Sequence, residues 1–98
     1  MNTIQGTFVK ALPVTEGDSQ SGKHWVRGGF VIEYGEEYRR QVAFTVYGQE
    51  KVDTVSLYYQ GIPVQVSFVP ESREYNDRWY TELRCISINT IPQPIPSR

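Results

Sequence analysis

The chain has 98 residues, of which 39% are hydrophobic and 21% charged, and this composition is typical of one soluble globular domain. Ten Lys and Arg against eleven Asp and Glu give a net charge of −1, which argues against a strongly basic binder of duplex DNA but leaves single-strand binding open. No apolar run approaches the roughly 20 residues of a membrane span, and residues 1–10 lack a signal-peptide pattern. With Cys85 as the single cysteine, these features predict a cytoplasmic protein without an internal disulfide.

The N-terminal half of the chain predicts three strands joined by loops. Apolar residues alternate in residues 3–12, where Gly6 is typical of a bend or bulge inside a strand. Residues 16–23 have the composition of a loop. Residues 25–34 and 39–47 alternate again, and the Gly-Glu-Glu run between them predicts a hairpin loop.

The C-terminal half predicts one helix and two more strands. Residues 49–58 are expected to form the helix, because their valines and Tyr59 follow helical spacing. Alternation returns in residues 62–69, and residues 78–88 supply the last strand. Residues 90–98 hold three prolines, which lack the N–H that a sheet ladder needs, so an extended tail is expected. The residues predicted to share the core-facing parity are Ile4, Phe8, Leu12, Val26, Phe30, Ile32, Tyr34, Val42, Phe44, Val46, Ile62, Val64, Val66 and Phe68.

The order of these elements predicts an all-β fold. Five strands with one short helix between the third and the fourth is the order of the OB-fold, a small five-stranded barrel. A long first strand with a central glycine favours this barrel over a sandwich, because such a strand can serve both sheets. We therefore expect one OB-fold domain over residues 1–89, followed by the tail over residues 90–98. Ligands of OB-folds bind on strands 2 and 3 and on the loops that join strands 1–2 and 4–5.

The hairpin between the fourth and fifth strands has an unusual composition. Residues 71–84, "ESREYNDRWYTELR", hold three aromatic residues, four acids and three arginines. Asn and Asp tolerate turn geometry, so the run "YND" predicts the turn of this hairpin. Aromatic faces and guanidinium groups together can stack on and neutralise nucleotides. The same residues could also cap the barrel, with the charges paired across the strands.

Three segments of the chain carry a family resemblance. They are "SGKHWVRGGFVIE", "FVIEYGEEYRRQVAFTVYG" and "QGIPVQVSFVPESREYNDRWYTELR", the last with the run R-E-Y-N-x-R-W-Y-T-[DE]-L-R. These segments, which span about residues 21–88, resemble the small OB-fold family of unknown function DUF3127. Less closely, they are similar to the bacterial single-stranded DNA-binding protein family. The resemblance implies an OB-fold, a homo-oligomer and binding of single strands.

Individual positions match the single-strand binders unequally. Tyr75 stands where that family places a stacking aromatic residue in the 4–5 loop, and Tyr47 matches the aromatic residue before glycine at the end of strand 3. Gln41 stands where those proteins often have a stacking tryptophan, so that contact is not implied. The chain also ends in a basic residue instead of an acidic tip, so recruitment of partners through such a tip is not implied.

The candidate binding residues are aromatic and basic side chains on one sheet face and in the 4–5 hairpin. An exposed tryptophan is unusual, since large apolar side chains are normally buried, and this makes Trp25 a candidate stacking platform. Tyr75 has no core to fill at the hairpin tip and is the strongest stacking candidate. The predicted nucleic-acid-binding residues are Lys23, Trp25, Arg27, Arg39, Gln41, Tyr47, Arg73, Tyr75, Arg78 and Trp79.

Structural alternatives stand beside several of these roles. The face of Trp25 could be covered by a second subunit or by the tail. Tyr47 could pack under the helix. Trp79 shares its parity with Leu83 and Cys85, which is also typical of a residue in the core at the barrel end.

The sequence lacks the patterns of common enzymes. It has no phosphate-binding loop, and one histidine with one cysteine cannot form a common zinc site. We therefore predict no catalytic residues, no metal and no cofactor, with Cys85 as a buried apolar residue. The leading hypothesis is a non-enzymatic protein that binds single-stranded DNA or RNA with low sequence specificity, without membrane or small-molecule partners. The alternatives are a protein-interaction module that binds no nucleic acid, and an oligosaccharide binder.

Overall fold

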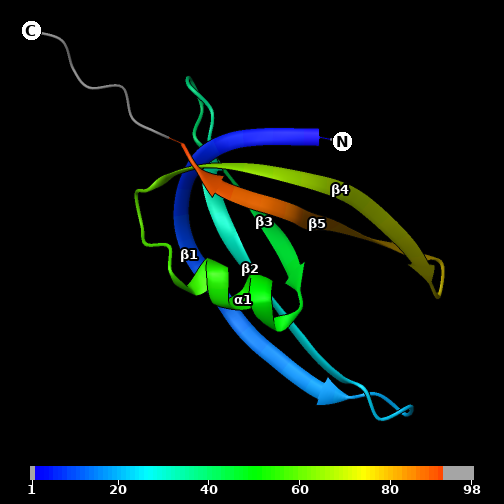
Figure 1. Cartoon of the computed structure of the whole chain (residues 1–98). Coiled ribbons are helices and arrows are strands. Elements are labelled where there is room, and N and C mark those ends of the chain that lie inside the picture. Colours follow the sequence, from blue (N-terminus) through cyan, green and yellow to red (C-terminus); the bar gives the residue numbers. More distant parts are fainter. Residues whose placement is uncertain (1, 92–98) are drawn as a thin grey trace, which may run out of the picture.

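The computed structural model of the protein describes residues 2–91 (Figure 1). The elements are β1 (Asn2–Asp18), β2 (His24–Tyr34), β3 (Arg40–Tyr47), α1 (Gln49–Ser56), β4 (Pro63–Tyr75) and β5 (Arg78–Thr90). The strands close a barrel in the order β1-β2-β3-β5-β4. This chain order and this closed barrel are those of the OB-fold, so the predicted fold class is confirmed.

Strand β1 serves both sides of the barrel, as its length predicted. Residues 2–7 pair antiparallel with β4, and residues 7–18 pair antiparallel with β2. A Cβ at Gly6 would lie 2.4 Å from the carbonyl oxygen of Glu33, so only glycine allows this close approach of the two backbones. The barrel is closed by a parallel contact between β3 and β5, at the pair Thr45 and Arg84.

The core is apolar and is built around a row of phenylalanines. Phe8, Phe30, Phe44 and Phe68 follow one another with ring centroids 5.2–5.9 Å apart. The buried residues are Phe8, Val26, Phe30, Ile32, Phe44, Val46, Val52, Val55, Val64, Val66 and Cys85, with Ile4, Val42, Ile62 and Phe68 packed against them. Most of the predicted core is thereby confirmed, including the burial of Cys85.

Leu12 and Tyr34 are exceptions, because neither is part of the buried core. The register between β1 and β2 shifts between Phe8 and Lys10, so the alternation changes face within β1. Leu12 consequently pairs with Gly29 on the outer side of the sheet.

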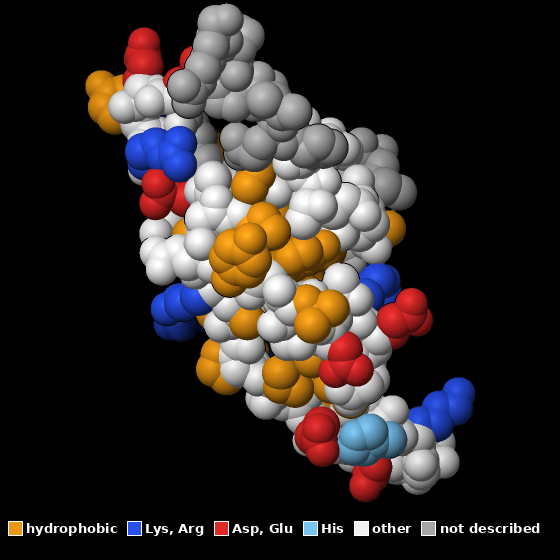
Figure 2. Space-filling view, turned by 60° about the vertical axis from the view of Figure 1, so that its left-hand side comes forward, with side chains coloured by type: hydrophobic (Ala, Val, Ile, Leu, Met, Phe, Trp, Pro, Cys, Tyr) orange, Lys and Arg blue, Asp and Glu red, His pale blue; other side chains and the backbone are white. Residues whose placement is uncertain are grey.

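Helix α1 covers one end of the barrel with Val52 and Val55, which are buried as expected. It ends at Ser56, two residues before the predicted end, and Tyr59 lies outside it with 68% of its surface exposed. Tyr58 packs instead of Tyr59, with its ring 5.7 Å from Phe8 and its hydroxyl donating to the Ile88 carbonyl oxygen. Figure 2 shows hydrophobic side chains gathered on this side of the molecule, away from the strand ends that project to the right in Figure 1.

Two pairs of strands extend beyond the barrel as two-stranded arms (Figure 1). In the first arm β1 continues to Asp18, which pairs with His24, so the loop is shorter than the predicted residues 16–23. The second arm contains residues 69–83 of β4 and β5. Its turn has positive φ at Asn76 (52°) and Asp77 (63°), the geometry of a type I′ hairpin, and this confirms the predicted turn.

The C-terminal end of the described residues bears on the predicted tail. Strand β5 continues to Thr90, which pairs with Val64. The remainder of the predicted tail, residues 92–98, lies outside the described residues. Within residues 2–91, no helix is long and apolar enough to cross a bilayer.

Candidate functional site

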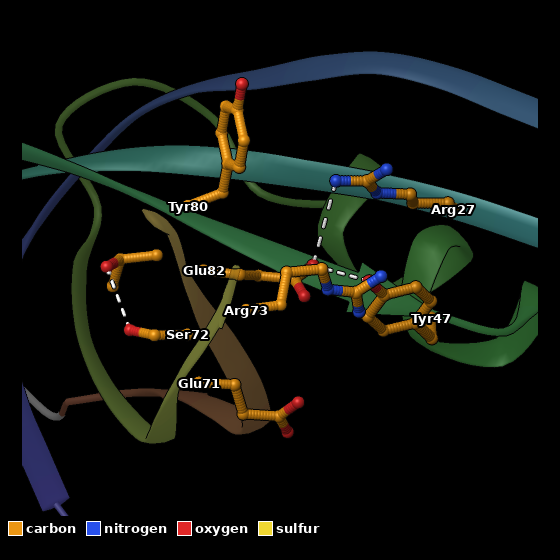
Figure 3. Close-up of a pocket in the computed structure, with 8 residues that line it drawn as sticks. Arg27, Tyr47, Glu71, Ser72, Arg73, Tyr80 and Glu82 are labelled. Atoms are coloured by element: carbon orange, nitrogen blue, oxygen red, sulfur yellow. Dashed lines mark hydrogen bonds and ion pairs between the residues drawn. The ribbon is translucent and has the colours of Figure 1, made fainter. Parts of the chain in front are cut away.

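A groove lies between the end of β3 and the second arm (Figure 3). Its volume is about 420 Å³. The lining residues are Arg27, Tyr47, Glu71, Ser72, Arg73, Tyr80, Thr81 and Glu82. A shallower hollow shares four of these residues and adds Arg84. Four strands therefore contribute side chains to one surface that is rich in arginine and tyrosine.

Strand pairing explains why these residues meet. Partners across antiparallel strands lie on the same face of a sheet. Tyr47 is the partner of Arg27, Tyr80 is the partner of Arg73, and Glu71 is the partner of Glu82. The closing contact between β3 and β5 then brings the β2–β3 pair beside the β4–β5 pair.

Glu82 lies at the centre of the polar contacts in the groove (Figure 3). The Tyr47 hydroxyl donates a 2.5 Å hydrogen bond to Glu82 Oε1, and Arg27 Nη2 lies 3.7 Å from the same oxygen. The Glu82 side chain is only 19% exposed. The groove therefore contains a fixed negative charge among its arginines.

The surroundings of this pair shift both pKa values. Partial burial acts to raise the pKa of Glu82, but hydrogen bonds from Tyr47 and Thr45 and the charges of Arg27 and Arg73 outweigh it, so the pKa lies below its usual value. The pKa of Tyr47 is raised by burial and by its bond to the Glu82 carboxylate. At neutral pH the cluster consists of an ionised glutamate and a neutral tyrosine.

The ring of Tyr47 supports two guanidinium groups. The guanidinium carbons of Arg27 and Arg84 lie 5.9 and 5.2 Å from the ring centroid, within cation–π range. Arg84 Nη1 also lies 3.7 Å from Glu71 Oε1. Tyr47 lines the groove and does not pack under the helix. Because its ring already contacts two cations, Tyr47 is better placed to position arginines than to stack on a base.

The second arm carries three further predicted residues. Tyr75 is 67% exposed and pairs with Arg78 at the tip. By alternation both share the face of Arg73 and Tyr80. Trp79 pairs with Glu74 on the opposite face and is also 67% exposed, so its alternative role in the barrel core is wrong. The arm extends beyond the barrel, and there is no core at this position for Trp79 to fill.

The first arm carries Trp25 and Lys23. Trp25 is 46% exposed and lies two residues before Arg27 on the same outward face of β2. Its ring rests on Gly17, where a Cβ would lie 2.8 Å from the ring. Lys23 is exposed next to the tip of this arm. Neither residue lines the groove.

Arg39 and Gln41 lie at the other end of the β2–β3 pair. Gln41 is six residues from Tyr47 along β3, a distance of about 20 Å at the usual rise of a strand. Arg39 Nε donates to Glu33 Oε1 at 2.8 Å, and Arg39 Nη1 donates to the carbonyl oxygen of Gly35 at 2.9 Å. The structure therefore does not bring these two predicted residues into the groove.

Sequence reasoning missed six lining residues, Glu71, Ser72, Tyr80, Thr81, Glu82 and Arg84. Their alternation along β4 and β5 was visible, but their charges were interpreted only as cross-strand pairs. One such pair exists, between Glu71 and Arg84, whereas Glu82 contacts Arg27 of another strand.

Other chemistry is sparse in the described residues. Among residues 2–91, no group of three or more His, Cys, Asp or Glu side chains could hold a metal ion. Burial raises the pKa of the Cys85 thiol to about 11, so this thiol stays protonated at neutral pH.

Comparison with known proteins identifies the family. Residues 3–89 match the model of DUF3127, a domain of unknown function. The chain belongs to this family. No curated protein sequence matches it.

Solved structures with the same fold share little sequence with this family member. The mitochondrial single-stranded DNA binding protein Rim1 from S. cerevisiae matches with a TM-score of 0.66 and 16% identity, over 95% of this chain and 96% of that chain. The N-terminal domain of PriB from Thermoanaerobacter tencongensis, described as dimeric, matches with a TM-score of 0.61 and 16% identity, over 94% of this chain and 96% of that chain. The second OB-fold domain of replication protein A from Methanococcus maripaludis matches with a TM-score of 0.61 and 16% identity, over 96% of this chain and 86% of that chain. These likenesses confirm the OB-fold.

Proposed function

We propose that this DUF3127 protein binds single-stranded DNA with low sequence specificity and without catalysis. The observation that carries the proposal is the groove, where Arg27 and Arg73 of different strands converge beside Tyr47 and Tyr80. Guanidinium groups can neutralise strand phosphates, and exposed aromatic rings can stack on bases of any sequence.

The two arms extend this surface on either side of the groove. Tyr75 with Arg78 at one tip, and Trp25 with Lys23 on the other arm, supply an aromatic ring and a cation at each end. A single DNA strand lying in the groove would contact arginine side chains through its phosphates in the middle, and aromatic rings could stack on its bases at both ends. The fold shared with Rim1, PriB and replication protein A supports this proposal. We also propose a homo-oligomer, by analogy with the dimeric PriB domain.

The first test is a titration of tryptophan fluorescence with an oligo-dT strand of about 30 nucleotides, which exceeds the site size of one OB-fold. We expect saturable quenching at low salt that weakens steeply as salt rises, because phosphate binding releases counterions. A flat titration, together with no shift of the strand in a gel, would refute the proposal and favour a protein-interaction module.

The second test removes the stacking rings. The double variant Trp25→Ala and Tyr75→Ala should weaken binding of a fluorescently labelled strand at least about tenfold, since each base–aromatic stack contributes about 1–3 kcal/mol. Tyr59→Ala is the matched control, because Tyr59 is as exposed as Tyr75 (68% against 67%) but follows α1, away from the arms. Equal affinities of wild type and double variant would contradict the stacking role.

A further inference from the structure

Glu82 is an unusual residue for a groove that is proposed to bind a polyanion. Its side chain is mostly buried, and one carboxylate oxygen accepts a hydrogen bond from the Tyr47 hydroxyl and lies 3.7 Å from Arg27 Nη2. Arg73 contributes a second favourable charge from β4. Carboxylate and phosphate oxygens are equivalent partners for a guanidinium group. In the free protein Glu82 thus contacts an arginine that could otherwise bind a phosphate of the DNA strand.

We propose that Glu82 competes with the bound DNA strand for Arg27. The Glu82 carboxylate holds Arg27 in the free protein, and a phosphate of the DNA must displace that contact on binding. This inference rests on the proposed function and names the residue that limits the affinity of the same groove. Glu82 would make the complex weaker and more easily released than the arginines alone would allow.

The contact of Glu82 with Arg27 is weaker than its contact with Tyr47, so Arg27 can exchange Glu82 for a phosphate. At 3.7 Å the contact between Arg27 and Glu82 is an ion pair that lies beyond hydrogen-bond distance, and the Arg27 side chain is 53% exposed. Arg27 can therefore turn toward a phosphate with little loss. Glu82 cannot leave as easily, because Tyr47 holds it by a short hydrogen bond and its side chain is mostly buried. Its negative charge stays in the groove and repels the incoming phosphate.

The test is the variant Glu82→Gln, which removes the charge but keeps an acceptor for the Tyr47 hydroxyl. A like charge about 4 Å away in water weakens binding by about fivefold, so we expect Glu82→Gln to bind oligo-dT about fivefold more tightly at low salt. Arg27 makes the same phosphate contact in the wild type and in the variant. The slope of log K against log salt concentration, which counts phosphate contacts, should therefore stay close to that of the wild type.

Glu33→Gln is the matched control. It makes the same change of net charge and also frees an arginine, since Glu33 Oε1 lies 2.8 Å from Arg39 Nε. Glu33 is six residues from Arg27 along β2, at the far end of the sheet. We expect its affinity and its salt slope to stay close to those of the wild type.

The outcomes separate the inference from the proposed function. If the wild type binds and Glu82→Gln binds no more tightly than Glu33→Gln, the inference is overturned and the proposed function stands. If neither wild type nor Glu82→Gln binds, the proposed function fails and the inference fails with it. Thermal unfolding checks the fold of each variant. If Glu82→Gln is unfolded, Glu82→Thr, which is neutral and suits a strand, replaces it with the same expected result.

Discussion

Substitution of Tyr47 by phenylalanine tests whether the groove is held together by the hydrogen bond to Glu82. The change removes one oxygen atom and leaves the ring, so the contacts of the ring with Arg27 and Arg84 are kept. A hydrogen bond to a charged group contributes about 1.5–3 kcal/mol when it is buried. Tyr47 is 37% exposed, so water can partly replace its hydroxyl as a donor to the carboxylate.

We therefore expect Tyr47→Phe to lower the free energy of unfolding by about 1 kcal/mol at pH 7, which corresponds to about 4–8 °C in Tm for a domain of this size. Urea denaturation followed by circular dichroism measures this difference. Tyr80→Phe is the control, because Tyr80 lines the same groove and is 52% exposed, and no hydrogen bond of its hydroxyl occurs among the described residues. It should change stability by less than about 0.5 kcal/mol.

The dependence on pH gives a second check of the same bond. The pKa of Glu82 in the folded protein is lowered from its usual 4.5, so ionised Glu82 stabilises the fold above that usual value. This stabilisation is lost as pH falls through the lowered pKa. The difference between wild type and Tyr47→Phe should consequently be full at pH 7 and smaller below about pH 4. A difference near zero at pH 7, or one that grows in acid, would refute the reasoning.

Two further predictions concern the barrel. Phe30→Ala removes a fully buried ring from between Phe8 and Phe44 and should destabilise the protein by about 3–5 kcal/mol in urea denaturation; a loss below about 1 kcal/mol would show that the row of phenylalanines is not the centre of the core. The Cys85 thiol, buried and with a pKa raised to about 11, should react with a thiol reagent at pH 8 at least about a hundredfold more slowly in the native protein than in urea. Similar rates in the two conditions would contradict its burial.

Alternation along the strands predicted the strands of the fold and most of the core. A strand with one buried face must place its apolar residues at every second position, so Phe30, Phe44 and Val64 could be assigned to the core from the sequence. The turn at Asn76 and Asp77 was predictable for a local reason, because both residue types tolerate positive φ.

The errors came from features that alternation does not contain. A shift of register within β1 moved Leu12 out of the core, and cross-strand pairing extended the first arm to Asp18. Alternation also gives the face of a residue but not its position along the sheet. Arg39 and Tyr47 were therefore grouped into one site, although Arg39 directly precedes β3 and Tyr47 is its last residue.

The central role of Glu82 depends on a contact that is distant in sequence. The groove forms only because β3 lies beside β5, where the structure records one parallel pair of residues, Thr45 and Arg84. No local pattern in the sequence predicts this contact between β3 and β5. The sequence identified the aromatic and basic composition of the site, whereas its geometry required the folded barrel.

The two arms also affect how the protein behaves at high concentration. Beyond the barrel, each described arm strand pairs only with its neighbour, so the outer edges carry backbone groups that could add a strand from another molecule. In the second arm Pro70 removes one N–H donor, and the charges of Glu71, Arg73 and Glu74 disfavour stacking of arm on arm. Glu71 and Arg73 therefore oppose pairing of one arm with another and also line the groove. Replacing several of these charged residues with alanine at once would favour association of molecules through the edges of the arms. The residues that bind DNA should therefore be identified with single, isosteric substitutions.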